Sequence, residues 1–370
     1  MTRTDEQSRQ YHRVKNTLSY VTVAMDVALL TLWIATGASA GLAAAARVFS
    51  KSVWLSTAVY LAIFQAVMTA VHFPFDFFTG YQWEHRYGLS TQTFPQWLKD
   101  EAKKAFFSFL LVLVFVEMIY FFLRRFPFWW WAWAAGFWLL VTVFLSRIMP
   151  QVIVPLFYKY VPVEDAALKE RVQALFKACA VGFRDVYAIK MSEKTRKANA
   201  FICGLGRSRR VILSDTLLAN FSLPQIEAVV AHELGHHKEK HILKIIAVNT
   251  AGAFLAFLCV HAALSWGVAR FGFQGLDDIG GFPLLLLMLL VFGLAGAPFS
   301  NALSRHFEYE ADRFSLALTR DKGAFISMLK QLGDLNLAET DPHWFNEMMF
   351  HDHPPLSKRI RFAQNFQDHS

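Results

Sequence analysis

Residues 232–236 read His-Glu-Leu-Gly-His, and their types and spacing could hold a catalytic metal ion. The hydrophobic period around them is helical, and residues four apart are neighbours on a helix, so His232 and His236 would share a face. Two neutral imidazoles placed in this way can bind one Zn²⁺, and Glu233 between them can act as general base on a water bound to the metal. The pattern therefore predicts a metallopeptidase.

The composition is typical of a membrane protein. Of 370 residues, 55% are hydrophobic and only 18% are charged, whereas soluble chains average about 25% charged residues. The net charge of +8 could favour nucleic-acid binding, but basic residues beside apolar spans are the ordinary signature of cytoplasmic loops, so no nucleic-acid partner is expected. The three cysteines lack the spacing of a disulfide framework or a thiolate metal site.

Six apolar segments are long enough to cross a bilayer, which takes about 20 helical residues. With four spans before a long polar insert and two after it, the insert, the N-terminus, the 79–104 loop and the tail share one side. Most of the 37 Lys and Arg residues lie on that side, so the motif is predicted to be cytoplasmic. The predicted spans are about 20–46, 53–78, 105–123, 127–149, 242–269 and 282–303.

The helix that carries the motif has a clear predicted start. Ser222 is a good N-cap, Pro224 fits the first turn, and Gln225 completes a capping box. We expect the helix to run through the motif and into the fifth span without interruption. His236 would then sit roughly 9 Å above the membrane entry, at 1.5 Å per residue.

A catalytic zinc usually has a third protein ligand, and Glu308 is the leading candidate. It follows the exit of the sixth span by about five residues, or roughly 8 Å, so an antiparallel hairpin would bring it to the height of the histidines. Glu310, Asp312 and His306 are rivals. Asp312 shares a helical face with Glu308 and suits a group that orients a zinc-bound histidine.

Several motifs together resemble the type I CAAX prenyl protease family, which are integral-membrane zinc metallopeptidases. The resemblance covers about residues 7–365. Members with seven spans have a first span without a counterpart here, and this shorter form resembles a bacterial protein. The motifs are His232–His236, the R-x-x-E-x-x-A-D run of Arg305, Glu308, Ala311 and Asp312, the Asn199-Ala200-Phe201 triplet, the 210–218 run, and His353-Pro354-Pro355 with Arg359.

The resemblance implies roles for these residues and a single catalytic zinc ion. It assigns His232, His236 and Glu308 as metal ligands and Glu233 as the catalytic base. His353 and Arg359 would stabilise the oxyanion or anchor the substrate. Asp312 and Arg305 would support the ligands from behind, and Asn199, Ala200 and Phe201 would form the open strand edge on which an extended peptide binds.

The expected fold is an all-α multi-pass membrane protein, in which about six transmembrane helices enclose a chamber, with a small α+β zinc-metalloprotease domain. Asp26, Glu117 and His261 fall within apolar spans and are candidates for lining the chamber. We expect four parts: a four-span membrane domain (1–149), a cytosolic insert with the substrate-edge strand and the zinc-binding helix (150–241), a transmembrane hairpin (242–303), and the C-terminal part of the protease domain (304–370).

The leading functional hypothesis is a membrane-embedded zinc endopeptidase of the bacterial inner membrane. Its partners would be membrane lipids and peptides, either lipidated CAAX-type tails cut near the C-terminus or misfolded and stalled membrane peptides; the oligomeric state is unknown. An intramembrane site-2-type protease is an alternative, but the charged residues 238–240 directly after the motif favour a surface position. A non-catalytic transporter or lipid-binding protein would not need Glu233.

Overall fold

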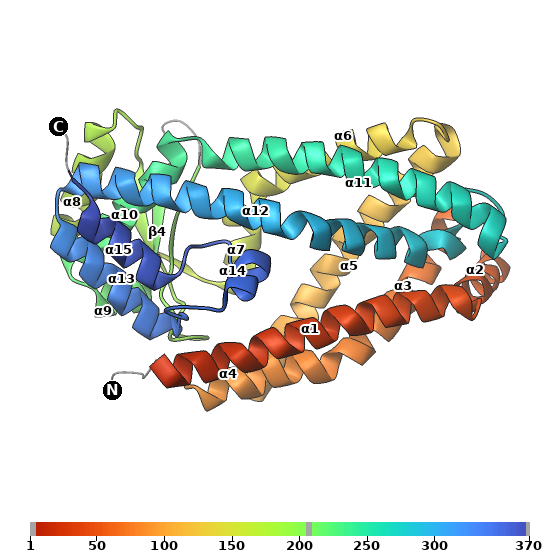
Figure 1. The fold of residues 1–370 in the computed structure, drawn as a ribbon, viewed down its shortest axis with the longest axis horizontal. Coiled ribbons are helices and arrows are strands. Elements are labelled where there is room, and N and C mark those ends of the chain that lie inside the picture. The colour runs from red at the N-terminus through yellow and green to blue at the C-terminus, as the bar shows by residue number, and fades with distance from the viewer. Residues whose placement is uncertain (1–4, 205–208, 368–370) are drawn as a thin grey trace.

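The long apolar helices extend away from a small mixed domain and converge at the end of the molecule opposite to it (Figure 1). This computed structural model describes residues 5–204 and 209–367. Within those residues, six helices are long and apolar enough to cross a membrane, as predicted. They are α1 (Asp5–Ala35), α3 (Val53–Asp76), α5 (Phe94–Arg125), α6 (Trp130–Ile148), α11 (His241–Phe271) and α12 (Phe282–Thr319).

The predicted end of the first span is wrong. Instead of one segment over 20–46, α1 ends at Ala35 and a separate helix, α2 (Ala38–Phe49), follows. Gly37 between them has a φ of 71°, a backbone conformation that glycine adopts without steric cost. The side chains stay apolar across this turn, so hydrophobicity alone did not reveal it.

The other helices extend beyond the predicted apolar segments. A π-helical turn at 77–82 joins α3 to α4 (Trp83–Arg86), and another at 149–153 joins α6 to α7 (Val154–Phe157). Helix α12 continues past the apolar segment that ends at 303 for about four further turns, so one rigid rod carries both a membrane span and the acidic residues near 308.

A four-stranded sheet forms the centre of the mixed domain. Its order is β1-β2-β4-β3, with β2 (Asp185–Ile189) parallel to β4 (Arg210–Ser214). Strand β1 (Tyr160–Pro162) pairs antiparallel with β2, and β3 (Ala200–Cys203) pairs antiparallel with β4. The predicted strand at 199–203 is therefore confirmed, and it lies at one edge of the sheet.

Short helices pack around this sheet and complete its hydrophobic core. Buried residues such as Val211 and Leu213 of β4, Val230 of α10 and Phe325 of α13 belong to one continuous cluster. A second cluster lies between the membrane helices. The short helices are α8 (Ala166–Ala178), α9 (Asp215–Asn220), α10 (Leu223–Lys238), α13 (Lys322–Asn336), α14 (Trp344–Phe350) and α15 (Leu356–Asn365).

The motif helix begins where the sequence predicts and ends earlier than expected. Ser222 and Gln225 form the capping box at the start of α10. The prediction of one uninterrupted helix into the fifth span is wrong, because α10 stops at Lys238 and α11 begins at His241. Lys240 between them is left-handed, with a φ of 56°. Residues 236–241 are all histidine, lysine or glutamate, so no hydrophobic period crosses this stretch to reveal the break.

Helices α10 and α12 are in close contact at the motif glycine, Gly235. A Cβ atom added to Gly235 would lie 3.1 Å from the Cα of Ala311 and 3.2 Å from the Cβ of Phe314. Because the facing atoms include backbone, the helices would have to move apart to accept a side chain. The small residues Gly235 and Ala311 therefore set the distance between the two helices that carry the candidate ligands.

We expect Gly235→Ala to destabilise the protein by about 1–3 kcal/mol through overpacking. Gly252→Ala in α11 is the matched control, since a Cβ there meets no atom within 4 Å and the loss of backbone entropy alone would stabilise by about 0.5–1 kcal/mol. Thermal unfolding of the detergent-solubilised proteins measures both. Equal shifts in the two variants would contradict a packing limit at Gly235.

Candidate metal centre and active site

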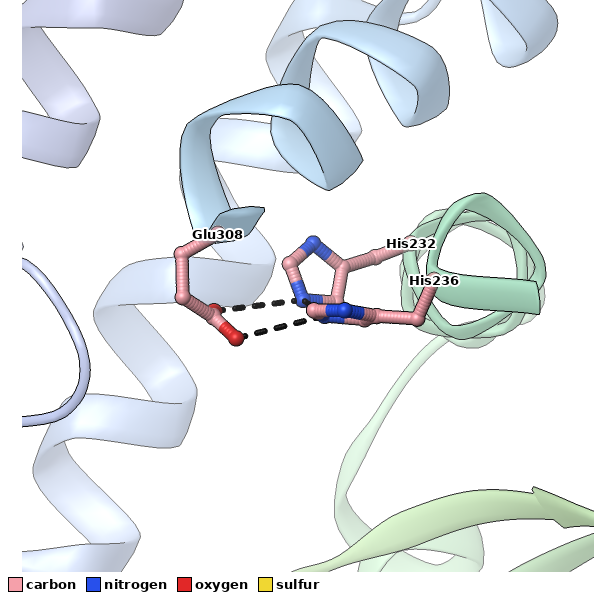
Figure 2. A group of neighbouring side chains, drawn as sticks. All are labelled: His232, His236 and Glu308. Atoms are coloured by element: carbon pink, nitrogen blue, oxygen red, sulfur yellow. Dashed lines mark hydrogen bonds and ion pairs between the residues drawn. The ribbon is translucent and has the colours of Figure 1, made fainter. Parts of the chain in front are cut away.

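The two motif histidines and Glu308 converge on one point between α10 and α12 (Figure 2). One ligand atom from each lies within 4.8 Å of the others. The Nε2 atoms of His232 and His236 are 3.2 Å apart, and they lie 3.4 Å and 3.2 Å from the two carboxylate oxygens of Glu308. The span-length argument thus placed Glu308 at the correct height, while Glu310 and His306 lie outside this group.

These three residues fit a zinc ion. Two imidazole nitrogens and one carboxylate are the usual ligand set of a catalytic zinc, which keeps a further position open. Glu308 is 4% exposed, and its buried Oε2 atom has no hydrogen-bond partner among the described residues. Such an atom is costly unless a cation or a donor satisfies it.

The electrostatics of the pocket favour a positive charge. Burial alone would lower the pKa of His232, but contacts with the Asp312 and Glu308 carboxylates outweigh it and raise that pKa to about 10. The surroundings therefore stabilise a cation next to the His232 ring. A metal ion bound between the ring nitrogens would benefit from the same carboxylates.

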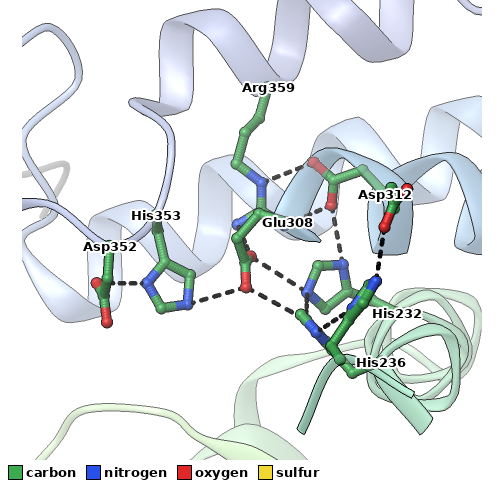
Figure 3. A network of polar contacts seen from close by, with 9 residues as sticks. His232, His236, Glu308, Asp312, Asp352, His353 and Arg359 are labelled. Carbon is green, nitrogen blue, oxygen red and sulfur yellow. Dashed lines mark hydrogen bonds and ion pairs between the residues drawn. The ribbon is translucent and has the colours of Figure 1, made fainter. Parts of the chain in front are cut away.

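Behind the ligands, Asp312 holds His232 and is itself held by Arg359 (Figure 3). The Nδ1 atom of His232 is 2.9 Å from Oδ1 of Asp312. Arg359 donates from Nε and Nη2 to the two oxygens of Asp312, at 2.8 Å and 2.6 Å. Asp312 is fully buried and Arg359 is 7% exposed, so this bidentate pair compensates two charges that would otherwise be buried alone.

The C-terminal histidine reaches the same site from a loop. The Nε2 atom of His353 is 3.4 Å from Glu308 Oε1, and its Nδ1 is 2.8 Å from Asp352 (Figure 3). The hydrogen bond to Asp352 raises the pKa of His353, although burial opposes it. The ring is therefore biased toward its protonated, hydrogen-bond-donating form.

Arg305 contacts the loop that carries His353 rather than a candidate metal ligand. Its guanidinium donates to the backbone carbonyls of Glu347 and His351, at 2.8 Å and 2.7 Å. These contacts join α12 to the loop that carries His353. Arg305 therefore positions that loop, and Asp312 alone of the two predicted supporting residues contacts a candidate ligand.

A cavity of about 510 Å³ connects the metal centre to the edge of the sheet. Asn199 and Ala200 line it, whereas Phe201 does not. Burial raises the pKa of Glu233 in this cavity, although the neighbouring histidines oppose the shift. The predicted site residues on its wall are Asn199, Ala200, His232, Glu233, Glu308, His353 and Arg359.

Two further residues near the site were not found from the sequence. His241 contacts His236, with 3.0 Å between their Nδ1 atoms. Asn336 at the end of α13 accepts a hydrogen bond from the Ala198 amide and donates one to its carbonyl, at 2.8 Å and 3.1 Å. On an uninterrupted helix, a residue five positions after His236 would point about 140° away from it, so the sequence did not suggest that His241 contacts His236. No motif in the sequence pointed to Asn336.

Comparison with known proteins identifies the family. The family model "Peptidase family M48" matches residues 162–367. A second model, described as "CAAX prenyl protease N-terminal, five membrane helices", matches residues 2–159. This chain belongs to peptidase family M48. The resemblance predicted from the motifs is confirmed.

Individual relatives agree over nearly the whole chain. The uncharacterized metalloprotease YhfN of Bacillus subtilis is 30% identical, covering 96% of this chain and 84% of its own. The human CAAX prenyl protease 1 homolog is 24% identical, covering 99% of this chain and 87% of its own. The crystal structure of S. mikatae Ste24p matches with a TM-score of 0.85 and 23% identity, over 97% of this chain and 88% of that one.

The protein is therefore a multi-pass membrane metalloprotease that depends on zinc. The predicted fold class is confirmed, with six candidate membrane helices and a small mixed protease domain in a Ste24p-like arrangement. The roles of the individual site residues stay predictions, as does the division into four parts.

We expect Arg359→Ala to destabilise the protein by about 3–5 kcal/mol, because it leaves the buried Asp312 carboxylate unpaired. The double variant Asp312→Ala, Arg359→Ala should cost less than the sum of the single changes, since it removes both charges. Chemical unfolding of the four proteins measures this coupling. Lys358→Ala is the control: its pair with Glu347 is half exposed and should be worth at most about 1 kcal/mol. Additive effects would show that the pair is not coupled.

Proposed function

We propose that this protein is a zinc endopeptidase that cleaves peptides near the C-terminus of membrane-associated or prenylated, CAAX-type substrates, or of misfolded and stalled membrane peptides. The observation that carries the proposal is the single cavity that joins His232, Glu233 and Glu308 to the strand edge at Ala200. Residues His12 and Asn16 of the membrane helix α1 line the same cavity, so a substrate held there is next to a membrane-spanning helix.

In this mechanism His232, His236 and Glu308 hold the zinc ion. When bound, zinc lowers the pKa of a water molecule and polarises the scissile carbonyl. Glu233 takes a proton from the attacking water and delivers it to the leaving amine. The raised pKa of Glu233 suits both tasks, because a general base works best when its pKa lies nearer to the operating pH.

His353 and Arg359 have complementary roles in the proposal. His353 donates a hydrogen bond to the oxyanion that develops at the scissile carbonyl, which matches its bias toward the protonated form. Arg359 donates hydrogen bonds from Nε and Nη2 to Asp312, so its Nη1 can donate to the bound substrate. That atom lies 3.8 Å from Glu308 Oε2.

The substrate binds by adding a strand to β3. Asn199 accepts a hydrogen bond from Ser214 of β4 at 2.9 Å, and hydrogen-bonded pairs alternate along an antiparallel pair, so Ala198, Ala200 and Ile202 direct their backbone groups outward. The side chain of Asn336 already forms hydrogen bonds with both the amide and the carbonyl of Ala198. Ala200 is then the outward residue next to the catalytic cavity. Its amide donates to the exposed side chain of Asn199 at 2.9 Å, a contact that a substrate carbonyl would replace, and main-chain pairing there gives affinity with little side-chain selectivity.

The active site faces the cytoplasm of a bacterium in this proposal, and the protein lies in the inner membrane. Of 37 Lys and Arg residues, those assigned to the opposite side are Arg47, Lys51, Arg124, Arg125 and Arg270. That asymmetry follows the positive-inside rule.

We expect Glu233→Gln to lower peptide cleavage by about 10²–10⁴-fold, the usual contribution of a general base, while zinc stays bound. Metal analysis of the purified protein, together with cleavage of a fluorogenic peptide, measures both. Glu308→Ala is the contrasting variant and should lose the zinc. Equal cleavage by Glu233→Gln and wild type would end this mechanism, and full zinc occupancy in Glu308→Ala would remove Glu308 as a ligand.

We expect N-methylation of the substrate backbone to separate strand addition from side-chain recognition. A methyl on an amide that faces β3 removes a hydrogen bond and should raise KM by about 2–10-fold, whereas methyl groups on the alternate amides should matter less. A series of peptides methylated at successive positions, assayed for kcat and KM, measures the pattern. A KM that shows no alternation along the series would argue against binding at the strand edge.

A further inference from the structure

His241 is buried directly behind the second motif histidine. It is the first residue of α11 and is completely buried. Its position depends on the break between α10 and α11, where the left-handed Lys240 redirects the chain. The turn brings the His241 ring back to His236, so that their ring centroids are 5.0 Å apart and their planes cross at 77°.

The contacts of the two rings form a directed chain of hydrogen bonds. The Nδ1 atoms of His236 and His241 are 3.0 Å apart, and the Nε2 atom of His241 is 2.8 Å from Oε2 of Glu310. A carboxylate only accepts hydrogen bonds, so His241 donates from Nε2 and its Nδ1 is left as an acceptor. His236 must then donate from Nδ1, which leaves its Nε2 lone pair free for a metal.

The surroundings hold His241 in this orientation. Its ring stacks on Phe307, with centroids 4.4 Å apart and planes inclined by 13°. Glu310 is fixed in turn by Lys244 at 3.6 Å and by His306 at 3.4 Å. Both ring nitrogens of this buried histidine therefore have a partner, one a carboxylate oxygen and the other a nitrogen of His236.

We propose that His241 and Glu310 form a relay that fixes the ring orientation and tautomer of His236 and thereby sets the zinc affinity of the site. The inference rests on the proposed function in that His236 is taken as a ligand. With this relay, each candidate histidine ligand is held by a pair of residues behind it. Asp312 and Arg359 hold His232, and His241 and Glu310 hold His236. Partners of this kind commonly change metal affinity about 10–100-fold when removed.

The test measures zinc affinity by chelator competition in the full-length protein, so it does not depend on any substrate. We expect His241→Ala to weaken zinc binding about 10–100-fold. His241→Gln should recover part of that loss, because its amide oxygen can still accept from His236. Glu310→Gln should weaken binding less, since an amide oxygen still accepts from His241. Absorption spectra of cobalt-substituted protein would report a changed ligand geometry in His241→Ala.

His343→Ala is the matched control, because its side chain is exposed and caps the start of α14, where it accepts a hydrogen bond from the Phe345 amide. It should keep zinc affinity within about twofold of wild type, as is usual for an exposed surface substitution. Thermal unfolding of the metal-free proteins checks that His241→Ala is folded. If His241→Ala had a lower unfolding midpoint than wild type but the same zinc affinity and cobalt spectrum, His241 would be purely structural and the relay would be overturned. Wild-type protein that binds no zinc would instead overturn the proposed function, and the relay with it.

Discussion

The close approach of α10 and α12 is the constraint on which the metal centre depends. His232 and His236 come from one helix and Glu308 from another, and the distance between them follows from how nearly the helices touch. Gly235 and Ala311 allow backbone to meet backbone at that point. A zinc–ligand bond is about 2.0–2.2 Å long, so a separation larger by one methyl group would leave Glu308 out of reach of an ion held by the histidines.

The same contact buries several charges, and the polar network around the site compensates them. Asp312 and Glu308 lie on one face of α12, and both are buried. Arg359 neutralises Asp312 with two hydrogen bonds, while Glu308 faces the histidines and has one oxygen, Oε2, without a hydrogen bond. Since an uncompensated buried charge is expensive, a zinc ion bound here would complete the charge balance of this core as well as supply chemistry.

Much of this arrangement could be predicted from the sequence, because it follows local rules. The capping box at Ser222, the helical spacing of the motif histidines and the lengths of the apolar segments placed α10, α12 and Glu308 correctly. The breaks at Gly37 and Lys240 could not be read in this way. Hydrophobic patterns report which residues avoid water, and they do not mark a turn that falls inside one apolar stretch, as at Gly37, or inside one polar stretch, as at Lys240. Contacts that depend on such turns, like that of His241, were therefore missed.

The break at Lys240 also joins the catalytic centre to the membrane. His241 at the start of α11 contacts His236 of α10, and Glu308 of α12 contacts the same histidine, so residues of two membrane helices meet α10 at the site. A fragment limited to residues 150–241 would contain the His-Glu-Leu-Gly-His motif but lack Glu308, Asp312 and Arg359. The ligand set is thus assembled only when the membrane helices are in place, which makes the geometry of the metal site depend on the packing of the spans that carry it.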